Sequence, residues 1–106
     1  MKRSTSPGLP TLLKVGGKTY RVELVRTMNR KGIQGRVYYE LGRIELGRYS
    51  NVDRRRYTNQ QVHETFWHEV VHAILYEMDS RLFSNERFVD TFAKHLSSAI
   101  RSARFA

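Results

Sequence analysis

Apolar and polar residues alternate along the first half of the chain and take a helical spacing in the second half. Within residues 11–27, Gly16-Gly17 separates two short apolar stretches, which predicts a β-hairpin. A second alternating stretch covers residues 35–49 and is interrupted by Gly42. Alternation with period two is typical of strands that pack one face on a core. The first half is therefore predicted to form a small antiparallel sheet of three to four strands.

The second half carries apolar residues at the spacing of two helices. The first runs from about Asn59 to Met78, with Thr58 or Asn59 as its cap. The second runs from about Asn85 to Arg101, with Ser84 or Asn85 as its cap and one apolar stripe formed by Phe88, Val89, Phe92, Ala93, Leu96, Ala99 and Ile100. Strands followed by helices predict an α+β fold.

Length and composition favour one compact domain over residues 11–106, preceded by a flexible tail at residues 1–10. The chain has no Cys, which excludes disulfides, thiolate catalysis and zinc fingers with Cys ligands. No apolar run approaches the ~20 residues that span a bilayer, and the N-terminus lacks the apolar region of a secretory signal. We expect a cytoplasmic protein that makes no membrane contact.

Positive charge is concentrated in the first half. Residues 1–60 hold 14 Lys and Arg against 4 Asp and Glu, whereas residues 61–106 hold 5 against 6. The run Arg54, Arg55 and Arg56 is the densest part of this basic region. Clustered cations attract phosphates or acidic proteins, but they also serve simply as a soluble surface. Contact with nucleic acid or with an acidic protein through these arginines is therefore one of two interpretations.

The motif His-Glu-Val-Val-His lies in the first predicted helix. Around a helical wheel, His68, Glu69 and His72 share one narrow polar stripe on a helix that is apolar nearly all round. Histidines four residues apart lie one turn apart, close enough to share a zinc ion, and burying them is costly unless they are paired or ligated. Glu69 is placed to accept a proton from a water beside such an ion. We predict one Zn²⁺ per chain, with Glu69 as the general base.

A catalytic zinc site needs a third protein ligand, and the acids and histidine downstream are the candidates. Asp79 lies nearly two turns beyond His72, and His95 lies about 180° from Glu86 around the second helix. We favour Glu86 as the ligand, because Asp90 one turn later then has a place as acceptor for the second N–H of a ligand histidine. Glu86 also suits the first turn of a helix, where acids are favoured regardless of metal.

The motifs HEVVH and NERFVD together resemble the gluzincin metallopeptidases, in which H-E-x-x-H supplies two zinc ligands and the base, and a following helix supplies E-x-x-x-D. The compact plan is similar to minimal, phage-associated zincins of the ImmA/IrrE type. The resemblance implies a peptide or protein substrate that pairs as an extended strand with a sheet edge, for which we expect the stretch GRIEL at residues 42–46. It also implies a transition-state His or Tyr, for which Tyr57, Tyr76 and His95 remain open.

Two functional hypotheses follow from the sequence. The first is a zinc-dependent metallopeptidase acting on a specific protein partner, with His68, His72 and Glu86 as ligands. The second is a noncatalytic zinc-containing binding module whose basic N-terminal half contacts nucleic acid or an acidic protein. Zinc content and salt-dependent binding distinguish them.

Overall fold

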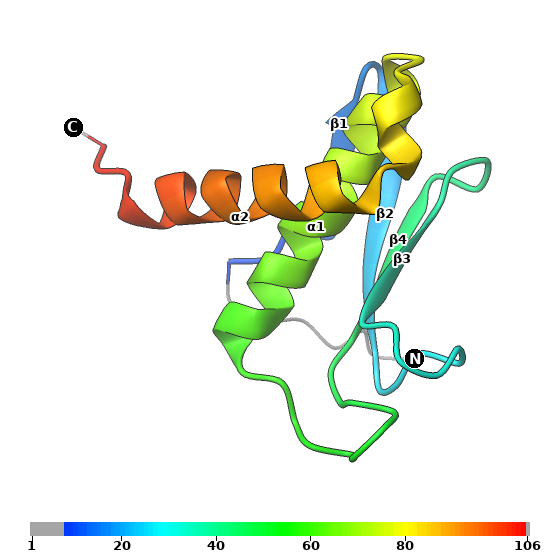
Figure 1. Cartoon of the computed structure of the whole chain (residues 1–106), viewed down its shortest axis with the longest axis vertical. Helices are drawn as coiled ribbons and strands as arrows, with labels where there is room; N and C mark the ends of the chain where they lie inside the picture. The colour runs from blue at the N-terminus through cyan, green and yellow to red at the C-terminus, as the bar shows by residue number, and fades with distance from the viewer. Residues whose placement is uncertain (1–7, 106) are drawn as a thin grey trace.

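The computed structural model, shown in Figure 1, describes residues 8–105. Residues 1–7 of the predicted tail lie outside the described residues, and Leu9 packs partly buried against the core. The elements follow one another as β1 (Leu12–Val15), β2 (Lys18–Val25), β3 (Gly35–Tyr38), β4 (Arg43–Gly47), α1 (Asn59–Glu77), the short 3₁₀ helix η1 (Arg81–Ser84) and α2 (Glu86–Ser102). The predicted α+β class, with strands first and helices after, is confirmed.

The four strands form one sheet in the order β1-β2-β4-β3. Strands β1 and β2 pair antiparallel, as do β3 and β4, but β2 and β4 run parallel with Val22 opposite Ile44. The sheet is thus mixed, and the expectation that every pair is antiparallel is wrong for this pair. The cause is the connection from β2 to β3. After β2 the chain crosses to form β3 at the edge of the sheet, and it then turns back through a hairpin so that β4 lies between β3 and β2.

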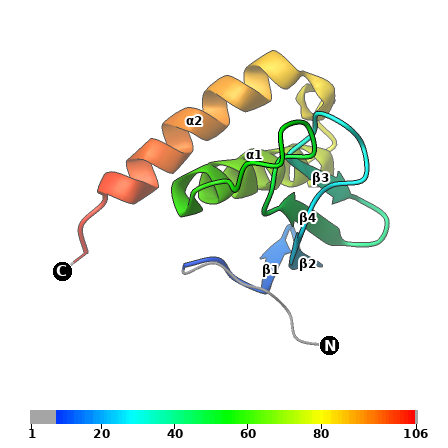
Figure 2. The same cartoon turned by 90° about the horizontal axis from the view of Figure 1, so that it is seen from below.

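The molecule has three layers, with α1 between the sheet and α2 (Figure 2). Helix α1 packs on β1, β3 and β4, whereas α2 packs on α1 and η1. The inward side chains of the strands meet α1 in one core cluster formed by Val15, Tyr20, Val22, Val37, Ile44, Leu46, Val62, Phe66, Val70 and Ala73. The hydroxyl of Tyr20 also donates to Glu77 Oε2 at 2.7 Å, which ties β2 to the end of α1. Helix α1 is therefore central, as its apolar circumference predicts.

Both helices begin at capped residues. Thr58 Oγ1 accepts from the Gln61 N–H at 3.1 Å and Gln61 Oε1 accepts from the Thr58 N–H at 2.8 Å, a reciprocal capping box. Asn85 Oδ1 accepts from the Phe88 N–H at 3.0 Å and caps α2. These two caps satisfy N–H groups of the first turns and so favour the observed start of each helix.

The apolar stripe of α2 is wider than the surface that α1 covers. Val89 and Ala93 are buried against Val71 and Leu75 of α1. Phe88, Phe92 and Ile100 lie on the outer side of the stripe and are 37%, 49% and 41% exposed. Among the described residues, no helix is both long and apolar enough to cross a membrane.

Candidate metal centre

Three side chains from two helices converge between α1 and the first turn of α2. His68 Nε2 lies 3.2 Å from Glu86 Oε1, and His72 Nε2 lies 3.1 Å from Glu86 Oε2. The two imidazole rings are one helical turn apart, with centroids separated by 5.0 Å. A single carboxylate thus bridges both histidines, and the structure brings together the three residues that the sequence analysis selected as ligands.

The spacing of these groups suits a metal ion. One ligand atom of each of His68, His72 and Glu86 lies within 4.8 Å of the other two. Two ligands that bind one zinc at about 2.0–2.1 Å with tetrahedral angles lie roughly 3.3 Å apart. The observed separations of 3.1 and 3.2 Å run to different oxygens of Glu86 and are those of hydrogen bonds, so the three residues could hold a metal ion without the distances identifying which one. The donor set of two imidazoles and one carboxylate is also one that zinc accepts in catalytic sites.

A backbone carbonyl orients one of the histidines. His72 Nδ1 donates to the Phe83 carbonyl at 2.6 Å, which leaves the lone pair on Nε2 directed at Glu86. Phe83 belongs to η1, whose first turn is capped by Ser80 Oγ accepting from the Leu82 N–H at 3.2 Å. The short helix between α1 and α2 therefore fixes the tautomer of His72.

Aromatic rings hold Phe83 in place. Tyr39 stacks on Tyr76 with centroids 4.2 Å apart, and Phe83 contacts both rings edge-on at 5.6 and 5.4 Å. Burial raises the pKa of Tyr39 to about 12, and the charges of Glu69 and Glu86 add to this rise. The turn after β3 is thus linked through packed rings to the carbonyl that orients His72.

The second acid of α2 lies beside the other histidine. Asp90 Oδ1 is 3.7 Å from His68 Nδ1, and its second oxygen is 3.1 Å from Lys94 Nζ. The first separation is longer than a hydrogen bond but within ion-pair range. Asp90 therefore lies beside His68 without a hydrogen bond to it, and its role as acceptor for a ligand histidine stays a prediction; Nδ1 of His72 pairs with the Phe83 carbonyl instead.

Glu69 lies on α1 between the histidines and the sheet, and it is buried with 7% of its surface exposed. Burial, followed by the negative charge of Glu86, raises the pKa of the Glu69 carboxyl to about 8. Both effects disfavour the carboxylate form and would be offset by a cation at the three ligands. A cation bound by these three residues would therefore favour the carboxylate form of Glu69.

The site opens into a cleft of about 430 Å³ between α1, α2 and the start of β3. His68, Glu69, His72, Glu86 and Asp90 line it together with Thr65 and residues 30 and 32–37. Gly35 packs closely on α1 in this wall, because a Cβ at this position would lie 3.1 Å from Glu69 Oε2 and 2.8 Å from Thr65 Cγ2. The lining thus includes the candidate metal ligands of α1 and α2 and residues 35–37 of strand β3.

The remaining predicted residues lie elsewhere. Tyr76 belongs to the aromatic cluster, Tyr57 packs against the core, and His95 is exposed on the face of α2 opposite Glu86. None of the three lines the cleft. The stretch GRIEL at residues 42–46 includes β4, which pairs on both sides and so is not an edge; the edge at the cleft is β3. Arg54, Arg55 and Arg56 lie in an exposed loop outside the cleft lining.

Gly35, Thr65 and Phe83 are parts of the site that sequence reasoning missed. Thr65 lies on the same polar stripe as the histidines, which was a usable signal, and its hydroxyl contacts Gln34 Oε1 at 3.1 Å. Gly35 begins the second alternating stretch without a signal that its lack of a side chain matters, and the Phe83 carbonyl is a backbone group without a sequence signature.

Comparison with known proteins adds no relative, because no family model, curated protein or solved structure matches this chain.

Proposed function

We propose that the protein is a zinc-dependent peptidase that hydrolyses peptide bonds of a specific protein partner. The observation that carries this proposal is the bridging of His68 and His72 by Glu86, with Glu69 beside them in an open cleft. His68, His72 and Glu86 would hold one zinc ion. When bound, the ion would act as a Lewis acid on the substrate carbonyl and lower the pKa of a water to about 7.

Glu69 is the group that moves the proton. Its carboxylate accepts a proton from the attacking water, whose oxygen adds to the carbonyl carbon of the scissile bond. Glu69 then passes this proton to the amide nitrogen as the C–N bond breaks, which gives a carboxylic acid and an amine; the acid's proton then passes to the amine, so that the final products are a carboxylate and an ammonium group. Burial of Glu69 keeps the carboxylate weakly solvated, which strengthens its interaction with a nearby proton donor.

Strand β3 offers the backbone groups that would hold the substrate. Gln34 O accepts from the Gly47 N–H at 2.8 Å, so alternate residues from Gln34 onward face β4. The N–H and C=O groups of Gly35 and Val37 accordingly point to the open edge of the sheet, where both residues line the cleft. An extended substrate would add as a further strand beside β3, with its scissile bond near Glu69.

The Glu69→Gln variant tests the proposal. The amide keeps the size of the side chain but cannot accept the proton, so zinc content should stay near that of the wild type while hydrolysis is lost. Zinc is measured by elemental analysis and hydrolysis by mass spectrometry of proteins from the native cell, incubated with wild type or variant. Equal cleavage by both proteins would refute the role of Glu69.

Zinc binding by a wild type that cleaves nothing would instead support the noncatalytic zinc-containing module. Thr65→Ser serves as the matched control, because it alters the same wall of the cleft but retains the hydroxyl and every proposed metal and proton-transfer group. It should keep both zinc and hydrolysis.

A further inference from the structure

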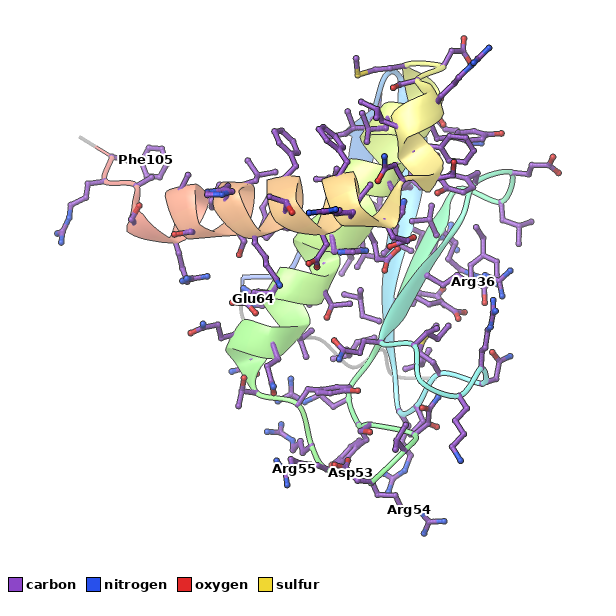
Figure 3. All side chains as sticks on the ribbon, viewed as in Figure 1. Arg36, Asp53, Arg54, Arg55, Glu64 and Phe105 are labelled. Atoms are coloured by element: carbon purple, nitrogen blue, oxygen red, sulfur yellow. The ribbon has the colours of Figure 1, made fainter. Side chains whose placement is uncertain are left out.

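Six exposed cations gather in two loops at one end of the molecule. Arg26, Arg30 and Lys31 come from the connection between β2 and β3, and Arg54–Arg56 come from the connection between β4 and α1. We call these six residues the basic end. Asp53 is the sole acid within residues 26–31 and 49–56. Figure 3 shows Arg54 and Arg55 extending away from the ribbon at this end.

Asn51 joins the two loops into one surface. Its Nδ2 donates to the carbonyls of Met28 at 2.7 Å and Arg30 at 2.9 Å, and its Oδ1 accepts from the Gly32 N–H at 2.9 Å. Beside it, the Tyr49 N–H donates to the Arg26 carbonyl, and the Arg26 guanidinium lies over the Tyr49 ring at 4.9 Å. Figures 1 and 2 show the loops side by side from two directions. The basic end is therefore held in a defined shape.

The protein neutralises only part of the charge of the basic end. Asp53 accepts from the Arg55 N–H, and this bond, together with the charge of Arg55, lowers the pKa of the Asp53 carboxyl. Within residues 8–105, none of these six cations forms an ion pair with an acidic side chain. Just beneath them, Arg48 is 9% exposed, and its Nη1 has no hydrogen-bond partner. Burial lowers the pKa of Arg48, and the charge of Arg56 lowers it further. This end of the molecule thus carries a positive potential that an anionic partner would relieve.

The basic end continues directly into the cleft. Arg30 and Gly32 line the cleft, and the next residues of the same chain segment lead into Gly35 at the start of β3. A peptide that lies along β3 and extends past Gly35 would therefore run onto the loop that contains Arg30 and Lys31. Asn51 holds the Arg30 carbonyl and the Gly32 N–H, so the loop that contains Arg54–Arg56 is fixed to the segment that enters the cleft.

We propose that the basic end binds an acidic segment of the substrate protein, adjacent to the residues that enter the cleft. This inference rests on the proposed peptidase function for the identity of the cleft, and it deepens that function by naming the substrate class. A protein segment fits better than nucleic acid, because the cations adjoin the edge of a strand suited to an extended polypeptide. Electrostatic attraction would also speed the encounter with such a substrate.

The experiment measures binding rather than cleavage. Fluorescently labelled peptides share one neutral core sequence and carry a run of glutamates, a run of lysines or neither at one end or the other. Their affinity for the zinc-loaded, full-length Glu69→Gln protein is measured by fluorescence anisotropy at low and high salt. Single-stranded and duplex oligonucleotides with the same number of negative charges are titrated in parallel.

Two triple variants separate local docking from net charge. Arg30→Ala/Lys31→Ala/Arg55→Ala removes three charges from the basic end, and Lys14→Ala/Arg81→Ala/Arg104→Ala removes three exposed charges elsewhere. Both lower the formal net charge of +9 by the same amount. The glutamate peptide should bind the first variant roughly ten-fold more weakly, since exposed ion pairs contribute about two-fold each, and the second almost as tightly as the parent.

The proposal is supported if the peptide with glutamates at one particular end of the core binds more tightly than all the other peptides. Its affinity should also fall at high salt and in the first variant. Equal losses in both triple variants overturn it, as does tighter binding of either oligonucleotide than of the glutamate peptide. The two proposals fail separately. If the Glu69→Gln protein binds as described but the wild type cleaves no peptide, the docking surface stands and the peptidase is refuted. Cleavage without regard to acidic flanking residues does the reverse.

Discussion

A methyl group added at position 35 would enter the tightest contact in the wall of the cleft. In Gly35→Ala, the new Cβ would lie 2.8 Å from Thr65 Cγ2, 3.1 Å from Glu69 Oε2 and 3.2 Å from the Glu45 carbonyl oxygen. The first distance is shorter than carbon atoms tolerate, and the Glu45 oxygen belongs to the backbone of β4. The strand and α1 must therefore separate slightly, or Glu69 must turn away from its place beside the histidines.

The size of the effect follows from two opposing terms. Inserting a methyl into a packed contact costs about 1–3 kcal/mol of the free energy of unfolding. Replacing Gly by Ala returns about 0.4–1 kcal/mol by restricting the unfolded chain. The net expectation for Gly35→Ala is a loss of about 1–2 kcal/mol, with a lower rate of hydrolysis if Glu69 is displaced.

Equilibrium unfolding in urea measures this loss, and a second substitution identifies its origin. Thr65→Ser removes the methyl in the shortest contact but keeps the hydroxyl that contacts Gln34. In the double variant, about 1 kcal/mol of the loss should return, a coupling typical of residues in contact. Unchanged stability of Gly35→Ala, or losses that simply add in the double variant, would show that the contact between β3 and α1 is not as close as described.

Three further predictions concern the ligands, the base and the cap of α1. Glu86→Gln should weaken zinc binding by at least ten-fold in a competitive chelator titration, whereas His95→Ala should leave it unchanged; the opposite order would make His95 the ligand. In metal-free protein, the raised pKa of Glu69 means that this carboxyl keeps its proton in the folded state at pH values where it has lost it in the unfolded state. The free energy of unfolding should therefore fall as pH rises from about 4.5 to about 8. Glu69→Gln should lack this fall and be more stable than wild type at pH 8 by up to several kcal/mol, at about 1.4 kcal/mol per pKa unit; parallel pH profiles would contradict it. Thr58→Ala should cost about 0.5–2 kcal/mol in thermal unfolding by removing the capping box, with zinc affinity retained, and an unaltered melting temperature would count against the cap.

The helices were predictable because their signals are local. Predicted bounds of Asn59–Met78 and Asn85–Arg101 compare with Asn59–Glu77 and Glu86–Ser102 in the structure. Apolar spacing, the side-chain caps and the polar break between the helices all depend on residues a few positions apart. The same local geometry placed His68 and His72 on one stripe and set Glu86 and Asp90 together on the margin of α2 that faces it.

Strand pairing was less predictable because it depends on residues far apart in the sequence. Alternation located the strands, but it does not state which strand lies next to which. The hairpin of β3 and β4 places β4 beside β2, and this single choice makes one pair parallel and turns β3 into the edge. The expected substrate edge at residues 42–46 was wrong for this reason. Tyr39 likewise left its expected strand for the turn, where it stacks on Tyr76.

The candidate site divides in the same way. Side chains that approach through helix periodicity could be inferred, whereas the Phe83 carbonyl and the contact at Gly35 depend on how η1 and β3 pack against α1. The exposed phenylalanines of α2 show that an apolar stripe in the sequence does not state how much of it another element covers. Phe88 and Phe92 belong to the predicted stripe, but only Val89 and Ala93 are buried against α1, and both rings stay exposed.

The proposal that His68, His72 and Glu86 hold zinc is tested most directly by the metal content of the purified chain. Full-length protein prepared without a metal-affinity column, dialysed against zinc and then against metal-free buffer, is analysed for zinc and protein in the same sample. One zinc per chain, lost in His72→Ala and kept in His95→Ala, is the predicted result. A wild type that retains clearly less than one zinc per chain after this treatment, or equal zinc in both variants, would contradict the proposed centre.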